Sequence, residues 1–462
     1  MSRLNVDAIH TEGSSAGSNL EFTADSRNVT AKGDLQVDGN VTVTGTLPAD
    51  KLTGTAAAIN GSNITNLPAA NLTGTLPAIS GANLTNLPAG GKGKNLFING
   101  AMAIDQRRAG SAEDFDSGKV WVVDRFFAQE EGTQNRITVQ QVDVAADTDP
   151  WNAGFRKAGK ITNGNQNDGP VAAAGVHLHY KFEAQDIAQS GWDYTSASSY
   201  VQLSFWVKSS VAFTLPFYIR SRDGSARMYS STQALSANTW TKVTKSIPGD
   251  TGGLQIDNDN DRGLELLVAP YYGTDGTADG STLNAWKAWS SSSRFEDVDT
   301  TWWDGDDATI EFTGFKLEVG SSVTDFDFES QAETLRKCQR YYQRYGSPKT
   351  FKQNGSGGFV DCTVFAMMLP YDGDDCSGGF PLPVEMRESP TLSGTDSNGG
   401  GDYIRIQGTS DDFNGGNFFQ INNSSPQFAG FHIDTPDGLE TDRQAGFYFN
   451  STAGYFDLDA EL

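Results

Sequence analysis

Cysteine is scarce in this chain. Only Cys338, Cys362 and Cys376 occur among 462 residues, an odd number without the spacing of a metal site, which argues against a disulfide-built scaffold. Long hydrophobic runs are also missing: no stretch approaches the roughly 18 apolar residues of a membrane-spanning helix, and the opening MSRLNVDAIH lacks the apolar centre of a signal peptide. We therefore expect neither membrane insertion nor conventional secretion.

Basic residues are outnumbered, with 34 Lys and Arg against 58 Asp and Glu, which gives a net charge of −24. A surface of that sign repels nucleic acids and anionic membranes, so neither is an expected partner. Charged residues make up only 20% of the chain, whereas aromatic residues reach 11% and Gly occurs 51 times. Aromatic residues together with many turn formers are typical of β proteins, so the composition predicts an all-β fold.

A polar repeat is present at residues 47–86. LPADKLTGTAAAINGSNITN (47–66) is followed by LPAANLTGTLPAISGANLTN (67–86), and a third copy begins at Leu87 and stops. Large aliphatic residues recur at fixed places in the two copies: Leu47, Leu52, Ile59 and Ile64, then Leu67, Leu72, Ile79 and Leu84. Their spacing fits neither a helix nor a strand, and the prolines exclude a continuous helix.

A single chain gains too little from burying these few side chains to offset the entropy lost when the backbone of the repeat is ordered. The segment is therefore either a disordered linker or a shaft that folds only between several chains. A flexible linker has no need to keep apolar residues in register, so the fixed places favour an interchain shaft with these eight aliphatic residues in its core.

After a hinge at AGGKGKN (89–95), apolar and polar residues alternate. GVHLHYKFEA places Val176, Leu178, Tyr180 and Phe182 on one face, and YVQLSFWVKS and FTLPFYIRS show the same pattern. In ATIEFTGFKLEVG the alternation slips by one residue at Gly314, which indicates a β-bulge. Such strands, separated by Gly, Asp and Ser turns, predict a jelly-roll-type β-sandwich over residues 95–346.

One helix is expected in this part of the chain. Ser330 and Glu333 form a capping box, and Leu335, Cys338 and Tyr345 follow at helical spacing until Gly346. The pattern predicts a helix over 331–345. The remaining residues, 347–462, return to β texture and predict a smaller C-terminal β domain, which leaves four segments: 1–46, 47–94, 95–346 and 347–462.

Several stretches carry a family resemblance in this order: MSRLNVDAI at the start, LTGTLPAISGANLTNLP in the repeat, NLFINGAMAIDQRRAG and VDRF (95–126), FTGFKLEVGSSVTDFDFES with CQRYYQRYG (312–346), then MRESPT and FDLDAEL. Together they resemble a bacteriophage tail-fibre protein of the kind common in marine and cyanobacterial phages. The resemblance implies an elongated, homotrimeric adhesin of the virion tail that is assembled in the host cytoplasm.

In that reading residues 1–46 attach to a phage tail, baseplate or adaptor protein, and 47–94 form the shaft. Residues 95–346 resemble a carbohydrate-binding-module-like sandwich with its closing helix, and 347–462 form the tip. The implied receptor is a host surface polysaccharide. Two alternatives stay open: a structural head-fibre or tail decoration protein without a receptor role, and a glycan-cleaving tailspike.

Aromatic residues beside carboxylates suggest where a glycan would bind. The stretch LNAWKAWSSSSRFEDVDTTWWD groups the candidates Trp286, Trp289, Trp302, Trp303 and Asp304, because exposed aromatic faces next to polar groups suit sugar rings. The alternative is that the tryptophans are core or interface anchors and that Asp304 belongs to an acidic turn.

No catalytic constellation is apparent, so we expect a protein that is not an enzyme and has no cofactor. Of the four histidines, His177 and His179 share a strand face but lack a third metal ligand, and are predicted to be surface residues. Asp257, Asp259 and Asp261 begin like an EF-hand loop, which then lacks the required Gly and Glu. Only a looser calcium site remains there, and no metal is expected.

Overall fold

The computed structural model describes residues 93–132, 136–164, 171–346, 367–370, 375–395, 404–406, 425–434, 445–449 and 455–462. All of the described residues belong to one compact unit, which lies within Leu84–Leu462. The predicted attachment segment 1–46 and all eight aliphatic residues of the predicted shaft core lie outside the described residues. The interchain shaft and the four-segment division therefore stay predictions.

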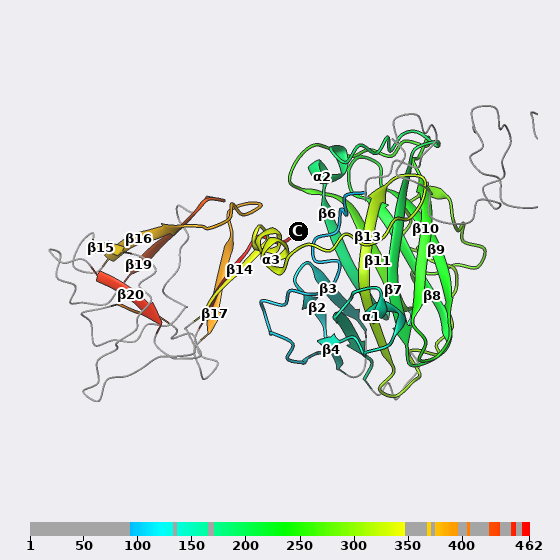
Figure 1. The fold of residues 1–462 in the computed structure, drawn as a ribbon, viewed down its shortest axis with the longest axis horizontal. Helices are drawn as coiled ribbons and strands as arrows, with labels where there is room; N and C mark the ends of the chain where they lie inside the picture. Colours follow the sequence, from blue (N-terminus) through cyan, green and yellow to red (C-terminus); the bar gives the residue numbers. More distant parts are fainter. Residues whose placement is uncertain are drawn as a thin grey trace, which may run out of the picture. The chain divides into compact units, whose positions relative to one another are not determined.

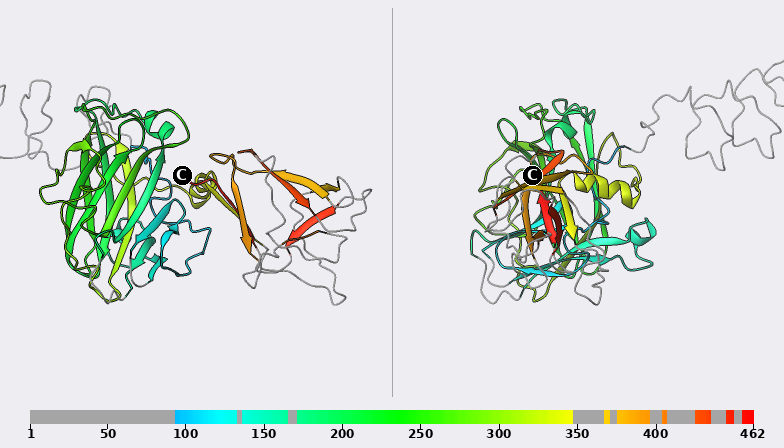
Figure 2. Two further views of the ribbon diagram at one scale, coloured as in Figure 1. Left: turned by 180° about the vertical axis from the view of Figure 1, so that it is seen from behind. Right: turned by 90° about the vertical axis from the view of Figure 1, so that its left-hand side faces the viewer.

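Two antiparallel sheets face each other in a sandwich (Figures 1 and 2). The six-stranded sheet has the order β1 (Glu113–Phe115), β4 (Ile137–Asp143), β5 (Lys157–Thr162), β13 (Thr309–Val319), β7 (Tyr200–Ser209) and β10 (Thr241–Pro248). The seven-stranded sheet has the order β12 (Trp286–Ala288), β9 (Arg227–Leu235), β8 (Phe213–Ser221), β11 (Arg262–Tyr272), β6 (Gly175–Glu183), β3 (Phe126–Glu131) and β2 (Gly118–Val123). The predicted all-β, jelly-roll-type fold is confirmed.

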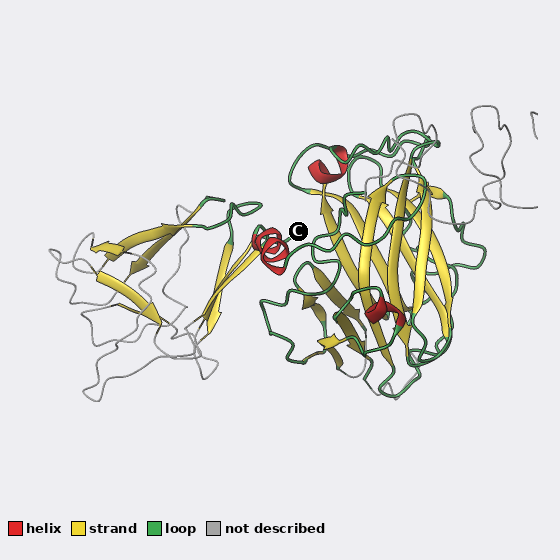
Figure 3. Ribbon diagram, viewed as in Figure 1, coloured by secondary structure: helices red, strands yellow, loops and turns green. Residues whose placement is uncertain are grey.

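Helices are short in the described part of the chain, as Figure 3 shows: α1 (Asp149–Asn152), α2 (Ala184–Ala188) and α3 (Gln331–Gln339). None of these described helices has the length and apolar character needed to cross a membrane.

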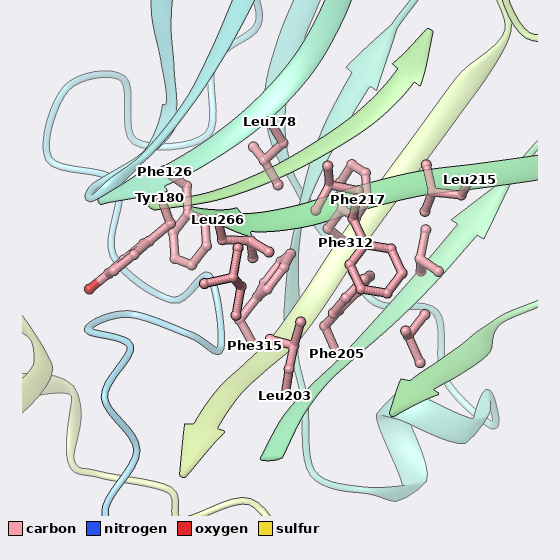
Figure 4. Close-up of a cluster of buried hydrophobic side chains, with 14 of the residues drawn as sticks. Phe126, Leu178, Tyr180, Leu203, Phe205, Leu215, Phe217, Leu266, Phe312 and Phe315 are labelled. Atoms are coloured by element: carbon pink, nitrogen blue, oxygen red, sulfur yellow. The ribbon is translucent and has the colours of Figure 1, made fainter. Parts of the chain in front are cut away.

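The core lies between the two sheets and is built from the alternating apolar residues. Val176, Leu178, Tyr180 and Phe182 of β6 are all buried in it, which confirms the face predicted from the alternation. Figure 4 shows how aromatic and aliphatic side chains from both sheets interdigitate, among them Leu178, Phe205, Phe217, Leu266 and Phe315. Because each strand turns every second side chain inward, the intervening residues form the outer faces of the sandwich.

The slip in the alternation of β13 is a β-bulge. Register shifts between Thr313 and Lys316, and Gly314 has a φ of +68°, a backbone conformation that glycine adopts without strain. A Cβ at this position would lie 2.7 Å from the ring of Phe155. The bulge allows Phe312 before it and Phe315 after it to point into the same core.

The helix predicted over 331–345 is correct at its start and wrong at its end. Ser330 caps α3, and its hydroxyl accepts a hydrogen bond from the Glu333 amide at 3.2 Å. The helix stops at Gln339, and Tyr342–Gly346 form strand β14 instead. β14 pairs with β21 (Tyr455–Asp459), so tertiary pairing overrides the local helical spacing.

The C-terminal strands form two further sheets. β21 lies between β14 and β17 (Thr391–Thr395) in a three-stranded sheet, and the five-stranded sheet has the order β18 (Ile404–Ile406), β20 (Ala445–Phe449), β15 (Met367–Pro370), β16 (Asp375–Pro381) and β19 (Phe428–Asp434). Two ion pairs join the sandwich to residues that flank the three-stranded sheet: Glu183 binds Arg340 at 2.7 Å, and Arg125 binds Glu461.

Candidate functional site

Polar side chains occupy the outer face of the seven-stranded sheet. Strand register places Lys181 of β6, Glu265 of β11 and Arg220 of β8 in one row across three neighbouring strands, since directly paired residues of antiparallel strands share a face. The same face contains a hollow of about 210 Å³. We call the six basic side chains that line this hollow the basic face: Lys119, Lys181, Arg220, Arg222, Arg262 and Arg294.

Glu265 is the buried counter-ion of three of these arginines. Its Oε1 lies 3.3 Å from Arg220 Nη1 and 3.7 Å from Arg222 Nη1, and its Oε2 lies 3.3 Å from Arg262 Nη1. The side chain of Glu265 is only 5% exposed. A single carboxylate cannot neutralise three guanidinium groups, so this part of the surface keeps a net positive charge.

The crowding of positive groups also affects their protonation. Burial, followed by the neighbouring positive charges of Lys119 and Arg262, lowers the pKa of Lys181 to about 7. Burial likewise lowers the pKa of Arg262, an effect that Glu265 opposes and that Arg222 and Arg220 reinforce. A bound negative charge would relieve this repulsion.

Two neutral histidines line the same hollow. His177 Nδ1 and His179 Nε2 lie 2.6 Å apart, so one ring donates a hydrogen bond to the other. Burial lowers the pKa of His177 to about 3, with a smaller contribution from Arg294. Burial also lowers the pKa of His179, and repulsion between the two rings when both are protonated lowers it further. Both rings are therefore uncharged at pH 7.

The prediction that these histidines are surface residues is wrong. His177 is 1% and His179 is 8% exposed. Aromatic rings cover them: Tyr272 stacks on His177 with ring centroids 5.4 Å apart, and Phe127 stacks on His179 at 4.7 Å. The partners come from strands β11 and β3, which the sequence alone does not place beside β6.

Several buried polar atoms of the site have no hydrogen-bond partner among the described residues. They include His177 Nε2, His179 Nδ1, Arg220 Nε and Arg294 Nε. Whichever ring holds the proton between the histidines, one of the two free ring nitrogens is a donor and the other is an acceptor. Buried polar atoms are normally paired, so these atoms suit a ligand that supplies hydroxyl groups and acceptor oxygens.

Aromatic rings flank the hollow, but cations already cover them. The Arg220 guanidinium carbon lies 3.8 Å from the centroid of the Trp289 ring, and Lys119 Nζ lies 4.1 Å from that of Trp121. One face of each ring is thus used in a cation–π contact rather than left open to stack on a sugar.

Of the four predicted tryptophans, only Trp289 lies beside the basic face. Trp286 is half-buried at the sheet edge, where its Nε1 donates to the Pro248 carbonyl at 2.7 Å. Trp302 and Trp303 are 0% exposed and belong to the main core. The structure therefore corrects the sequence-based hypothesis for these two side chains: they are core anchors at the entrance to β13, because their large apolar rings fill the space between the sheets.

Asp304 is exposed in a turn, and its carboxylate accepts a hydrogen bond from the Thr300 hydroxyl. This agrees with the alternative interpretation, in which Asp304 belongs to an acidic turn. Asp257, Asp259 and Asp261 are also exposed, in the loop before β11. Within the described ranges no group of three or more His, Cys, Asp or Glu side chains is arranged to hold a metal ion, so the looser calcium site has no support in this loop.

The basic face is not predicted from the sequence, although part of its signal is visible in the alternation of apolar and polar residues. Lys181 follows His177 and His179 on the polar side of β6, and Arg220 lies on the polar side of β8. What the sequence does not give is the strand order that places β11 between β6 and β8. Without that order the charges remain scattered along the chain.

Comparisons with known proteins give only distant structural similarity. No protein-family model matches the chain, and no curated protein matches it. Among solved structures, the enzymatically active domain of bacteriophage CBA120 tailspike protein 4 is 13% identical with a TM-score of 0.24, and the match covers 42% of this chain and 19% of that one.

Carbohydrate-binding modules also match. The family 11 module from Clostridium thermocellum, in complex with a β-1,3-1,4-mixed-linked tetrasaccharide, is 12% identical with a TM-score of 0.21, and the match covers 45% of this chain and 95% of that one. The xylan-binding CBM22-1 domain from Paenibacillus barcinonensis is 13% identical with a TM-score of 0.21, covering 46% and 98%. At these scores the similarities carry no further argument about the site.

Proposed function

We propose that this chain is a homotrimeric bacteriophage tail fibre that attaches the virion to a glycan on the host cell surface. The observation that carries the glycan part is the hollow on the outer face of the seven-stranded sheet, where buried nitrogens of His177, His179, Arg220 and Arg294 have no partner among the described residues. A hydroxyl-rich ligand supplies both donors and acceptors for such atoms.

The virion part of the proposal is supported by the sequence. The opening MSRLNVDAI and the repeat over 47–86 resemble the start and the shaft of phage tail fibres. In this proposal the N-terminal segment binds a tail, baseplate or adaptor protein, and the repeat joins three copies. Weak affinity at each sandwich is then multiplied, because several copies engage one cell surface at the same time.

We propose binding rather than cleavage. Hydrolysis of a glycosidic bond uses two carboxyl groups on either side of the bond, one of which transfers a proton. The carboxylates that line the hollow are Glu131 and Glu265, and both already have partners: Glu265 contacts three arginines, and Glu131 accepts from Gln129 Nε2 at 2.7 Å. Side chains held in this way suit ligand binding and charge balance.

The assembly is tested by the molar mass in solution of the full chain and of a chain that starts at Lys94. We expect a trimer near three times 49.6 kDa for the full chain, and weaker or no association without the repeat. A monomeric full chain would contradict the fibre and return residues 47–94 to the linker interpretation. A trimer that survives the truncation would move the assembly to the C-terminal domains.

Incubation with polysaccharide from the host envelope separates the three functions. Stable retention of intact polysaccharide supports the adhesin. Release of oligosaccharides would instead support a glycan-cleaving tailspike, and neither retention nor release would support a structural decoration protein.

A further inference from the structure

The charge of the basic face is opposite to that of the chain. The whole sequence has a net charge of −24, yet the hollow is lined by six basic side chains and by only two acidic ones, Glu131 and Glu265. Crowding like charges in a partly buried site is unfavourable in the free protein. A chain with so few basic residues therefore keeps a destabilising cluster at one place, which points to a negatively charged ligand.

We propose that the basic face binds an acidic glycan, a polysaccharide whose sugar units carry carboxylate or sulfate groups. This inference rests on the proposed function and names the class of its receptor. Arginine forks hold both kinds of group through paired, charge-assisted hydrogen bonds, while the neutral His177 and His179 are suited to sugar hydroxyls.

The state of the aromatic rings argues against a neutral glycan. Recognition of uncharged sugars relies on open ring faces, whereas Arg220 covers a face of Trp289 and Lys119 covers a face of Trp121. Trp302 and Trp303, which could have supplied such a platform, are fully buried. This surface is therefore suited to bind a glycan mainly through charge and not through ring stacking.

The extent of the basic surface suits a polymer. A second hollow of about 620 Å³ adjoins the first and shares Lys181, Arg220, Arg222 and Arg262 with it. Of the charged side chains that line only this second hollow, Asp223 and Asp261 are acidic and Arg387 is basic, so the four shared residues supply most of its positive charge. A chain of sugars can cross both hollows and place its acidic group on the shared arginines.

The inference is tested on the full chain with three soluble probes: alginate, which carries carboxylates, dextran sulfate, which carries sulfates, and neutral dextran. We expect the acidic probes to bind and neutral dextran not to bind. Affinity for the acidic probes should fall by roughly tenfold or more when salt rises from about 50 mM to about 500 mM, because salt screens exposed charges. The two acidic probes distinguish a carboxylate site from a sulfate site.

Charge-removing variants locate the binding. Arg222→Gln and Lys119→Gln should each weaken binding by about five- to tenfold, through the loss of one charge-assisted contact. Arg136→Gln is the matched control: it removes the same charge at a side chain that is 66% exposed and lies outside both hollows. We expect it to change affinity by less than about twofold, as is usual for an isolated surface charge.

Three results would overturn the inference. Equal binding of neutral dextran would show that charge is not what is recognised, and would leave the glycan attachment of the proposed function intact. Equal loss of affinity in the Arg136→Gln control would move the effect away from the basic face. Binding of a DNA duplex as tightly as the acidic glycans would show a surface for polyanions in general. The molar mass of the trimer and attachment to the host test the proposed function independently of these three results.

Discussion

The pH dependence of stability offers a direct test of the buried histidine pair. Burial lowers the pKa of His177 to about 3 from the ordinary histidine value of 6.5. On acidification the unfolded chain takes up a proton near pH 6.5, whereas the folded protein does not until about pH 3. The folded state is therefore fully favoured above about pH 6.5, and loses stability as the pH falls toward 3.

The size of the effect follows from this difference. Each pH unit below the unfolded pKa costs about 1.4 kcal/mol, so His177 should reduce the free energy of unfolding by about 2 kcal/mol at about pH 5. Asp124 acts in the opposite direction, because burial raises the pKa of its carboxyl group to about 6. The folded protein binds that proton more tightly than the unfolded chain. Acidification below about pH 6 therefore removes the unfavourable buried charge of Asp124 and raises the stability of the folded state.

A comparison with the His177→Asn variant separates the two groups, because Asp124 is present in both proteins. Urea unfolding followed by tryptophan fluorescence should be measured between about pH 7.5 and about pH 5. We expect the stability of the original protein, relative to the variant, to fall by about 2 kcal/mol over this range. A difference that stays constant with pH would refute the reasoning, since His177 would then titrate alike in the folded and unfolded states.

Three further substitutions test other parts of the structure. Trp302→Ala should cost about 3–5 kcal/mol in urea unfolding, because it empties a fully buried site; unchanged stability would mean that the ring is exposed. Glu461→Gln should lower the free energy of unfolding by about 3 kcal/mol, because it leaves the 2% exposed Arg125 side chain without its carboxylate. A double variant that also carries Arg125→Met should recover most of this stability, and no recovery would contradict the ion pair. Glu265→Gln should raise the affinity for dextran sulfate by about threefold or more by removing the central negative charge, whereas weaker binding would contradict its role as counter-ion.

Local pattern was sufficient to predict the sandwich strands. In β6 the alternation identified Val176, Leu178, Tyr180 and Phe182 as core residues, and in β13 the single-residue slip at Gly314 was visible in the sequence. Both signals are local, because the pleat of a strand fixes the side of each residue relative to its neighbours. The same holds for the cap at Ser330.

Features that depend on distant partners could not be predicted in this way. The helix ends at Gln339 because Tyr342–Gly346 pair with a strand that follows much later in the chain. The burial of His177 depends on Tyr272 of another strand, and the four candidate tryptophans look alike in the sequence although only some of them fill the core. The basic face is the clearest case, since it exists only once β6, β11 and β8 are neighbours.

The position of β21 has a consequence for how the protein is made. This strand lies between β14 and β17, both of which precede it in the chain, and Glu461 just after it binds Arg125 near the start of the sandwich. A ribosome must therefore translate to Asp459 before β14 and β17 have their partner strand, and to Glu461 before Arg125 has its carboxylate. We expect chains that stop before β21 to expose the unpaired edges of β14 and β17 and to leave Arg125 without its carboxylate. Such chains should be degraded or aggregate. Synthesis of β21 would thereby act as a check on the folding of this part of the chain.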